Sequence, residues 1–254
     1  MREGIPLPPV RGGADWYSFY PNILFANGLE YRPRPVIQSY SAYTPTLARM
    51  NADWLRSDRA ATNLFFFMQT LDFRFPALED GLSWPELLTR YDIEGFSSEY
   101  LYLSRSPAPR KYELQLLQET NVTLGTSFSL PVTNGPVWAE IEVSKTLPGD
   151  LFSLFYKPTT LMAKMKLAGQ SELDYRLIPG MAKAGFLLSP NIINNESFIA
   201  LAQGNETALA PQVVVAMTIY ESDESVPAFC YQRQAKIRFY RLKFPAQDSN
   251  VQVP

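Results

Sequence analysis

The sequence predicts a mixed α+β protein, in which a small α/β layered unit is followed by an antiparallel β-sandwich of jelly-roll-like type. Strand-like and helix-like segments alternate over residues 36–103, whereas helical patterns nearly vanish beyond residue 110. Aromatic residues make up 13% of the chain and prolines number 21, a composition typical of strand-rich proteins with many loops. A chain of 254 residues is also long enough for two modest domains.

The first unit is expected to span residues 16–106. Residues 1–15 precede it as a leader or linker that is rich in proline and glycine and has little to bury. The apolar segment at residues 16–29 indicates a short helix or turn packed on a core. A strand is expected at residues 36–39, because the two prolines just before it favour extended backbone.

A helix should follow this strand. Thr44 is a suitable N-cap and Pro45 a suitable first residue, and apolar side chains recur behind them at helical spacing. The continuous apolar segment 63–68 is typical of a strand covered on both faces. Residues 83–86, SWPE, fit a capping box that opens a second helix, and residues 100–103 indicate a closing strand. This alternation predicts largely parallel pairing with right-handed crossovers.

The composition changes at residues 105–110, RSPAPR, which indicates the boundary between the two units. The β-sandwich is expected over residues 110–246, with a tail at residues 247–254. Alternating patterns and turn residues predict strands at residues 112–119, 137–144, 151–156, 161–167, 173–178, 213–220 and 235–244. One short helix is expected near residues 195–203, and a hairpin with a Pro-Gly turn within residues 176–190.

Composition argues against several kinds of function. The chain has no histidine, which removes the commonest general base and metal ligand together with His-dependent serine and cysteine triads. Cys230 is the single cysteine, so no disulfide can form within the chain. With 23 basic and 25 acidic residues and no block of like charge, nucleic-acid binding is disfavoured. No metal or other cofactor is predicted, and no signal-peptide pattern is present.

Two carboxylates are the best enzymatic candidates. Asp72 and Asp80 follow the strand expected at residues 63–68, and open α/β sheets place ligand sites beyond their strand ends. Paired carboxylates act as general acid and base in glycoside hydrolysis, or bind divalent cations through oxygen. The alternative is a solvated turn in which Asp72 forms a surface ion pair with Arg74.

A polar and aromatic wall is the candidate ligand-binding site. Gln38, Tyr40 and Tyr43 leave the end of the strand expected at residues 36–39, and Arg74 lies in the loop that this wall would face. Aromatic rings and hydrogen-bonding groups together suit sugars or headgroups. The alternative is that the tyrosines pack with their hydroxyls in water and have no ligand.

Three segments carry a resemblance to a known group of proteins, namely residues 26–60, 71–92 and 176–190. They resemble the soluble C-terminal region of uncharacterised bacterial multi-pass membrane proteins that look like polyprenyl-sugar-dependent glycosyltransferases. The resemblance implies that a last membrane span precedes the leader and that the chain is a fragment or a split gene product. It also implies a location on the extracytoplasmic, or periplasmic, face of a bacterial membrane. No catalytic residue is carried over by it.

Three functions are compatible with these observations. The first is a non-catalytic accessory region that contacts a glycan or a lipid-linked sugar beside a membrane-embedded partner or parent chain. The second is a carboxylate-dependent enzyme that acts on carbohydrate or phosphoester through Asp72 and Asp80. The third is a structural interaction module in which the apolar rings of Trp16, Tyr17 and Phe19 dock on another chain. The lack of histidine and of any nucleophile motif favours the first.

Overall fold

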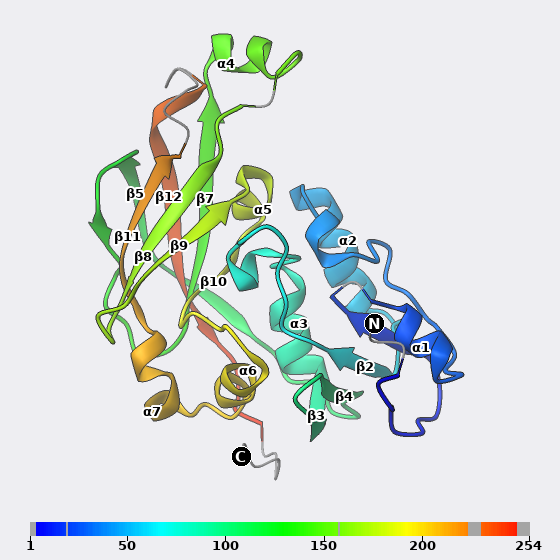
Figure 1. Ribbon diagram of the computed structural model, residues 1–254. Coiled ribbons are helices and arrows are strands. Elements are labelled where there is room, and N and C mark those ends of the chain that lie inside the picture. The colour runs from blue at the N-terminus through cyan, green and yellow to red at the C-terminus, as the bar shows by residue number, and fades with distance from the viewer. Residues whose placement is uncertain (1–3, 19, 157, 223–229, 248–254) are drawn as a thin grey trace.

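The computed structural model describes residues 4–18, 20–156, 158–222 and 230–247. A small α/β unit packs beside a larger unit that consists mainly of long strands (Figure 1). The mixed α+β class predicted from the sequence is confirmed.

The α/β unit has a mixed four-stranded sheet. Its elements are β1 (Ala14–Tyr17), α1 (Asn22–Ala26), η1 (Ser39–Ser41), α2 (Pro45–Arg56), β2 (Asn63–Phe66), η2 (Pro76–Leu78), α3 (Ser83–Arg90), β3 (Tyr91–Phe96) and β4 (Leu101–Arg105). The strand order is β1-β2-β4-β3, and β1 and β2 are parallel while the other pairs are antiparallel. The expectation of largely parallel pairing is wrong, because a tight turn joins β3 to β4 as a hairpin that needs no crossover helix.

The two main helices of this unit fall where the sequence predicts them. Thr44 caps α2 as expected, since its hydroxyl accepts a hydrogen bond from the backbone N–H of Leu47 at 3.3 Å. The capping box expected for α3 is wrong: Leu82 already has helical backbone angles, so Ser83 lies inside the helix and caps nothing. Glu86 instead forms ion pairs with arginines of α2 and α3.

The strand expected at residues 36–39 is also wrong. The backbone N–H of Val36 donates to Asn51 Oδ1 at 2.8 Å, and its carbonyl accepts from Asn51 Nδ2 at 3.0 Å. One side chain of α2 thus satisfies the groups that a neighbouring strand would have paired, and the chain continues into η1. The parallel partner of β2 is β1, which includes Ala14 and Asp15 from the expected leader.

The larger unit contains two four-stranded antiparallel sheets in its described residues. Its elements are β5 (Glu113–Thr123), β6 (Phe128–Ser129), β7 (Val137–Lys145), α4 (Leu147–Phe152), β8 (Leu161–Leu167), β9 (Glu172–Leu177), α5 (Pro179–Ala184), β10 (Phe186–Ser189), α6 (Asn195–Ala202), α7 (Glu206–Leu209), η3 (Ala210–Gln212), β11 (Val214–Glu221) and β12 (Tyr231–Lys243). One sheet has the order β10-β7-β12-β5 and the other β6-β11-β8-β9. The jelly-roll-like arrangement of a sandwich stays a prediction.

Two expectations for this unit are wrong. Residues 151–156 form the end of α4 and the turns after it, not a strand, and most of their side chains are exposed. Residues 176–190 are not a hairpin, because β9 and β10 belong to different sheets. The proline at position 179 begins α5, and Gly185, with φ at 100°, ends it. The other six strands and the helix near residues 195–203 are confirmed.

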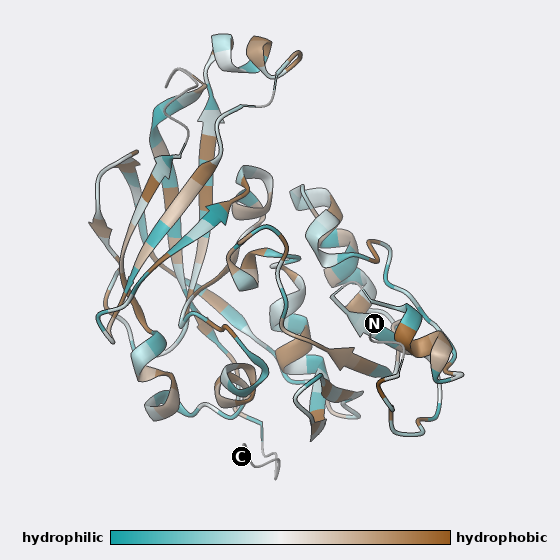
Figure 2. Ribbon diagram, in the orientation of Figure 1, coloured by the Kyte–Doolittle hydropathy of each residue, from teal (hydrophilic) through white to brown (hydrophobic). Residues whose placement is uncertain are grey.

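The two units share one hydrophobic core. The rings of Phe66 in β2 and Trp84 in α3 contact Phe198 of α6, with centroid distances of 4.8 and 5.8 Å. The backbones also approach closely: a Cβ on Gly81 would lie 2.3 Å from the Gly185 carbonyl oxygen, and one on Gly180 would lie 2.1 Å from that of Tyr43. Hydrophobic residues accordingly occur where the units meet as well as inside each (Figure 2).

Candidate functional site

The two candidate catalytic carboxylates have different surroundings. Asp72 lies on the loop after β2, has more than half of its side chain exposed, and accepts a hydrogen bond from Arg176 Nη1 at 3.1 Å. Asp80 is fully buried and accepts hydrogen bonds from the Tyr17 hydroxyl and from Asn51 Nδ2. The partners of Asp72 lie at the surface and those of Asp80 in the core, so the geometry does not support an acid–base pair.

The structure brings some residues of the candidate ligand-binding wall into contact and leaves one exposed. Arg74 is 2% exposed and donates hydrogen bonds to the Tyr40 carbonyl at 2.8 Å and to the Tyr43 hydroxyl at 2.9 Å. Its guanidinium carbon also lies 5.1 Å from the centre of the Tyr43 ring. Gln38 is exposed and precedes η1, where its carbonyl accepts a hydrogen bond from Ser41. These contacts hold the loop before α2 against the loop after β2.

Glu79 lies beside Arg74, and burial of the Glu79 carboxyl shifts its pKa. Its Oε1 accepts a hydrogen bond from the backbone N–H of Leu71 at 3.0 Å and lies 3.5 Å from Arg74 Nη1. Burial outweighs both of these favourable contacts and raises the pKa of Glu79 to about 7. The carboxyl is therefore easier to protonate in the folded protein than in the unfolded chain.

This pKa predicts a dependence of stability on pH. Between the ordinary pKa of 4.5 and about 7, the folded protein holds the Glu79 proton more tightly than the unfolded chain does. The contribution of Glu79 to the free energy of unfolding should therefore fall by up to about 3 kcal/mol as the pH rises through this window. Glu79→Gln should remove that part of the slope, which urea unfolding of both proteins at pH 5 and pH 8 measures. Equal slopes would contradict the prediction.

A buried ion network at the centre of the α/β unit was not predicted from the sequence. Arg34 is 1% exposed and donates to Asp15 Oδ2 at 2.8 Å, to the Ser18 carbonyl at 3.0 Å and to Ser39 Oγ at 3.1 Å. Its guanidinium carbon lies 4.0 Å from the centre of the Tyr17 ring, which adds a cation–π contact. The residues come from separate segments, and no local pattern marks an arginine between two prolines as buried.

The acidic partners of Arg34 are costly to ionise. Burial raises the pKa values of Asp15 and Asp80, and the charge of Arg34 acts against that rise. Arg34 Nε lies 4.0 Å from Asp80 Oδ2, so one arginine serves both carboxylates. Because solvent does not reach this network, we infer that its role is to stabilise the fold of the unit.

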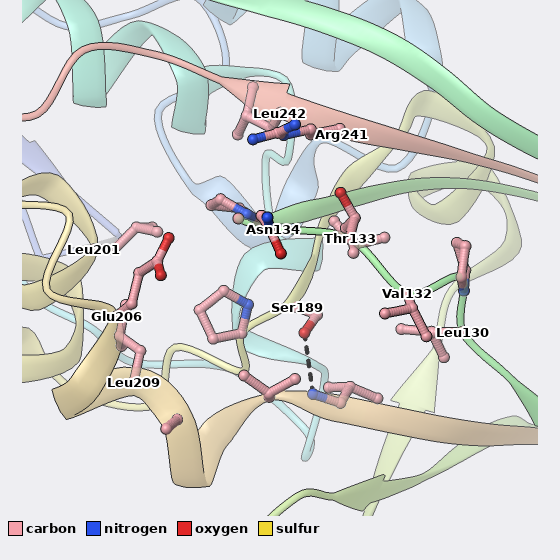
Figure 3. Close-up of a pocket in the computed structure, with 18 of the residues that line it drawn as sticks. Leu130, Val132, Thr133, Asn134, Ser189, Leu201, Glu206, Leu209, Arg241 and Leu242 are labelled. Carbon is pink, nitrogen blue, oxygen red and sulfur yellow. Dashed lines mark hydrogen bonds between the residues drawn. The ribbon is translucent and has the colours of Figure 1, made fainter.

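A cavity of the described chain lies in the β unit, near α6 and α7 (Figure 3). Its volume is about 820 Å³, which is in the range of small-molecule sites. The walls come from the loop at residues 129–137, the end of β10, helices α6 and α7, the start of β11 and the end of β12. Buried apolar side chains that line it are Leu130, Val137, Leu201, Leu209, Val214 and Leu242.

Few polar side chains line this cavity, and they differ in whether they are free to bind a ligand. The hydroxyl of Ser189 accepts a hydrogen bond from the backbone N–H of Val214 at 3.0 Å, which ties β10 to β11 and leaves Ser189 structural (Figure 3). Arg241 and Lys243 of β12 also line the cavity, and neither forms an ion pair with any other described residue. Glu206 of α7 is exposed at its edge. Arg241 and Lys243 are therefore two cations without an ion-pair partner among the described residues, and they lie beside an apolar cavity.

The remaining candidates do not form a surface site. Trp16 and Tyr17, expected to dock on another chain, are 1% and 2% exposed because β1 packs them inside the molecule. Phe19 lies outside the described residues. The described part of the chain contains no group of three or more Cys, Asp or Glu side chains placed to hold a metal ion.

The cavity could not have been found from sequence motifs, because several separate segments build it and each looks locally like ordinary core or loop. Over the described ranges, none of the helices has both the length and the apolar character needed to cross a bilayer. Comparisons of the chain with protein-family models, with curated proteins and with solved structures found no match. The function is therefore argued from the geometry of the cavity.

Proposed function

We propose that this chain is a non-catalytic binding unit whose ligand is an amphipathic anion held in the cavity between β6, β11, β12 and the helices α6 and α7. The observation that carries the proposal is the combination of an apolar cavity of about 820 Å³ with two cations that are free of protein partners among the described residues. A lipid-linked sugar phosphate belongs to this class of ligand, as do simpler lipid phosphates and fatty acids.

The apolar lining supports the part of the proposal that concerns the ligand's body. Leu201, Leu209 and Leu242 present aliphatic carbon to the cavity and offer no hydrogen bonds. Burial of apolar surface contributes about 25 cal/mol per Å², so a chain of about ten methylenes would gain several kcal/mol there. A free sugar would lose its hydration in such a space without replacing it.

The two cations support the part that concerns the ligand's head. Arg241 and Lys243 are half-buried residues of one strand, and a phosphate or carboxylate beside them would form charge-assisted hydrogen bonds. Figure 3 shows Arg241 and Glu206 from different elements at the edge of the same space. The carboxylate of Glu206 repels an anion on its own side, which favours placement of the head near β12.

The resemblance stated from the sequence supports a place beside a membrane-embedded partner on the extracytoplasmic face of a bacterial membrane. Digestion of this chain by protease added to intact spheroplasts is the expected result. Protection in intact spheroplasts, with digestion only after lysis, would contradict that location.

Replacing Arg241 with methionine should weaken binding of dodecyl phosphate about 5-fold, equivalent to about 1 kcal/mol, because the head loses one charge-assisted contact while the cavity keeps its apolar wall. Dodecanol, which has the same chain and no charge, should bind both proteins equally. Isothermal titration calorimetry of both probes measures the two affinities.

Arg233→Met is the matched control, because Arg233 lies on the same strand and does not line the cavity. Val213→Trp should weaken binding of both probes, since Val213 lines the cavity and an indole would fill part of it. Absence of binding by the unmodified chain, or equal losses for Arg241→Met and Arg233→Met, would refute the proposal.

A further inference from the structure

A second exposed feature lies at the opposite end of β7 from the cavity. Residues 147–156, called here the apolar tip, comprise α4 and the turns that follow it, and they project beyond the ends of both sheets (Figure 1). The exposed fractions are 87% for Leu147, 62% for Leu151, 75% for Leu154, 76% for Phe155 and 67% for Tyr156. Figure 2 shows hydrophobic residues at this projecting end.

The tip is held in place by its own backbone. The N–H of Thr146 donates to the Cys230 carbonyl at 3.1 Å, and the Thr146 hydroxyl caps α4 by accepting from Gly149 at 3.0 Å. A Cβ on Gly149 would lie 2.1 Å from the same Cys230 oxygen, so only glycine permits this approach. The rings of Phe152 and Tyr156 stack with their centroids 5.1 Å apart. The exposed apolar side chains therefore belong to an ordered structure.

The tip carries almost no charge. Asp150 is its single charged residue, and it lies 4.0 Å from Lys145 Nζ, just before the tip. The segment from Leu151 to Tyr156, LFSLFY, contains leucine, phenylalanine and tyrosine with one serine. Aliphatic side chains with a tyrosine beside them suit a boundary that is apolar on one side and wet on the other. A partner for this surface need not be charged.

The size of the tip decides between a lipid and a protein partner. Five exposed apolar residues stand on a narrow projection, whereas a stable protein interface uses about 20–30 residues on each side. Insertion into a bilayer needs no matching surface, because the apolar side chains enter the acyl region individually. The geometry points to a lipid surface as the partner of the apolar tip, which docks there through Leu151, Leu154 and Phe155.

The unmodified chain is expected to float with extruded phosphatidylcholine vesicles in a density gradient. Leu154→Ser combined with Phe155→Ser should lower the partition coefficient by about 10-fold or more, because two large side chains leave the acyl region. Flotation should change little when salt is raised or when phosphatidylglycerol is added, since Asp150 is the single charged residue of the tip and lies 4.0 Å from Lys145 Nζ. A fluorophore placed by Phe155→Cys should shift to the blue on binding, and the buried Cys230 leaves this label specific.

Phe73→Ser combined with Leu116→Ser is the matched control, because these side chains are 85% and 56% exposed and lie outside the tip. This variant should float like the unmodified chain. Failure of the unmodified chain to float, or equal losses in both double variants, would overturn the inference. A dimer in lipid-free sedimentation that the tip substitutions dissociate would also overturn it, since a second copy would then cover the tip. Dodecyl phosphate binding in the cavity is independent of each result.

Discussion

Replacing Arg34 with methionine is expected to lower the free energy of unfolding by about 3–5 kcal/mol. The guanidinium is buried within reach of Asp15 and Asp80, and both carboxylates would remain in the core without a cation. Methionine fills much of the same volume, so the loss measures the uncompensated charge more than a cavity. The backbone carbonyl of Ser18 would also lose its hydrogen bond from Arg34.

Urea unfolding followed by circular dichroism measures this effect. Arg32→Met is the matched control, because Arg32 pairs with Glu30 at 3.0 Å with side chains 40% and 62% exposed, and its loss should change the free energy of unfolding by less than about 1 kcal/mol. Asp15→Asn should partly rescue Arg34→Met by removing one of the unpaired charges. Similar losses for the two arginine variants would show that the buried network is not the source of stability.

Truncation of Phe198 to alanine is expected to destabilise the protein by about 3–5 kcal/mol. The ring is fully buried between Phe66 and Trp84, so its removal opens a cavity where α6 meets the α/β unit. Because a single core cluster includes residues of both units, we expect the loss to appear as one cooperative transition of the whole chain.

Far-ultraviolet circular dichroism and tryptophan fluorescence should therefore report the same midpoint in the unmodified chain and in Phe198→Ala. The matched control is Phe155→Ala, since Phe155 is 76% exposed and its loss should change stability by less than about 0.5 kcal/mol. Two separated transitions in the unmodified chain would show that the units fold independently and that the shared core does not couple them.

The elements that could be predicted from the sequence are those with a local cause. Thr44 and Pro45 specify the start of α2 through a cap and a fixed φ, and alternation along β7 and β8 specifies their buried faces. Residues 151–156 show where such patterns fail, because an apolar run predicts a strand whether or not a partner strand exists. No strand among the described residues pairs with it, and it forms part of the apolar tip.

The candidate sites were harder to predict because they depend on distant segments. Tyr43 and Arg74 were expected to lie near each other, and they do, although the strand assumed to place Tyr43 is absent from the described chain. The burial of Arg34 could not be predicted, because an arginine is seldom buried unless it is paired and its partners lie elsewhere in the sequence. The cavity combines several segments whose residues are individually of ordinary type, so only their packing reveals it.

The close approach of backbones at Gly81 and Gly180 constrains how this protein can change over evolutionary time. Each unit supplies one glycine against a carbonyl of the other, so a side chain acquired on either would force the neighbouring unit to move. Substitutions at these contacts are tolerated only when both units adjust together. The two halves therefore cannot be shuffled separately between proteins and have to be inherited as a matched pair.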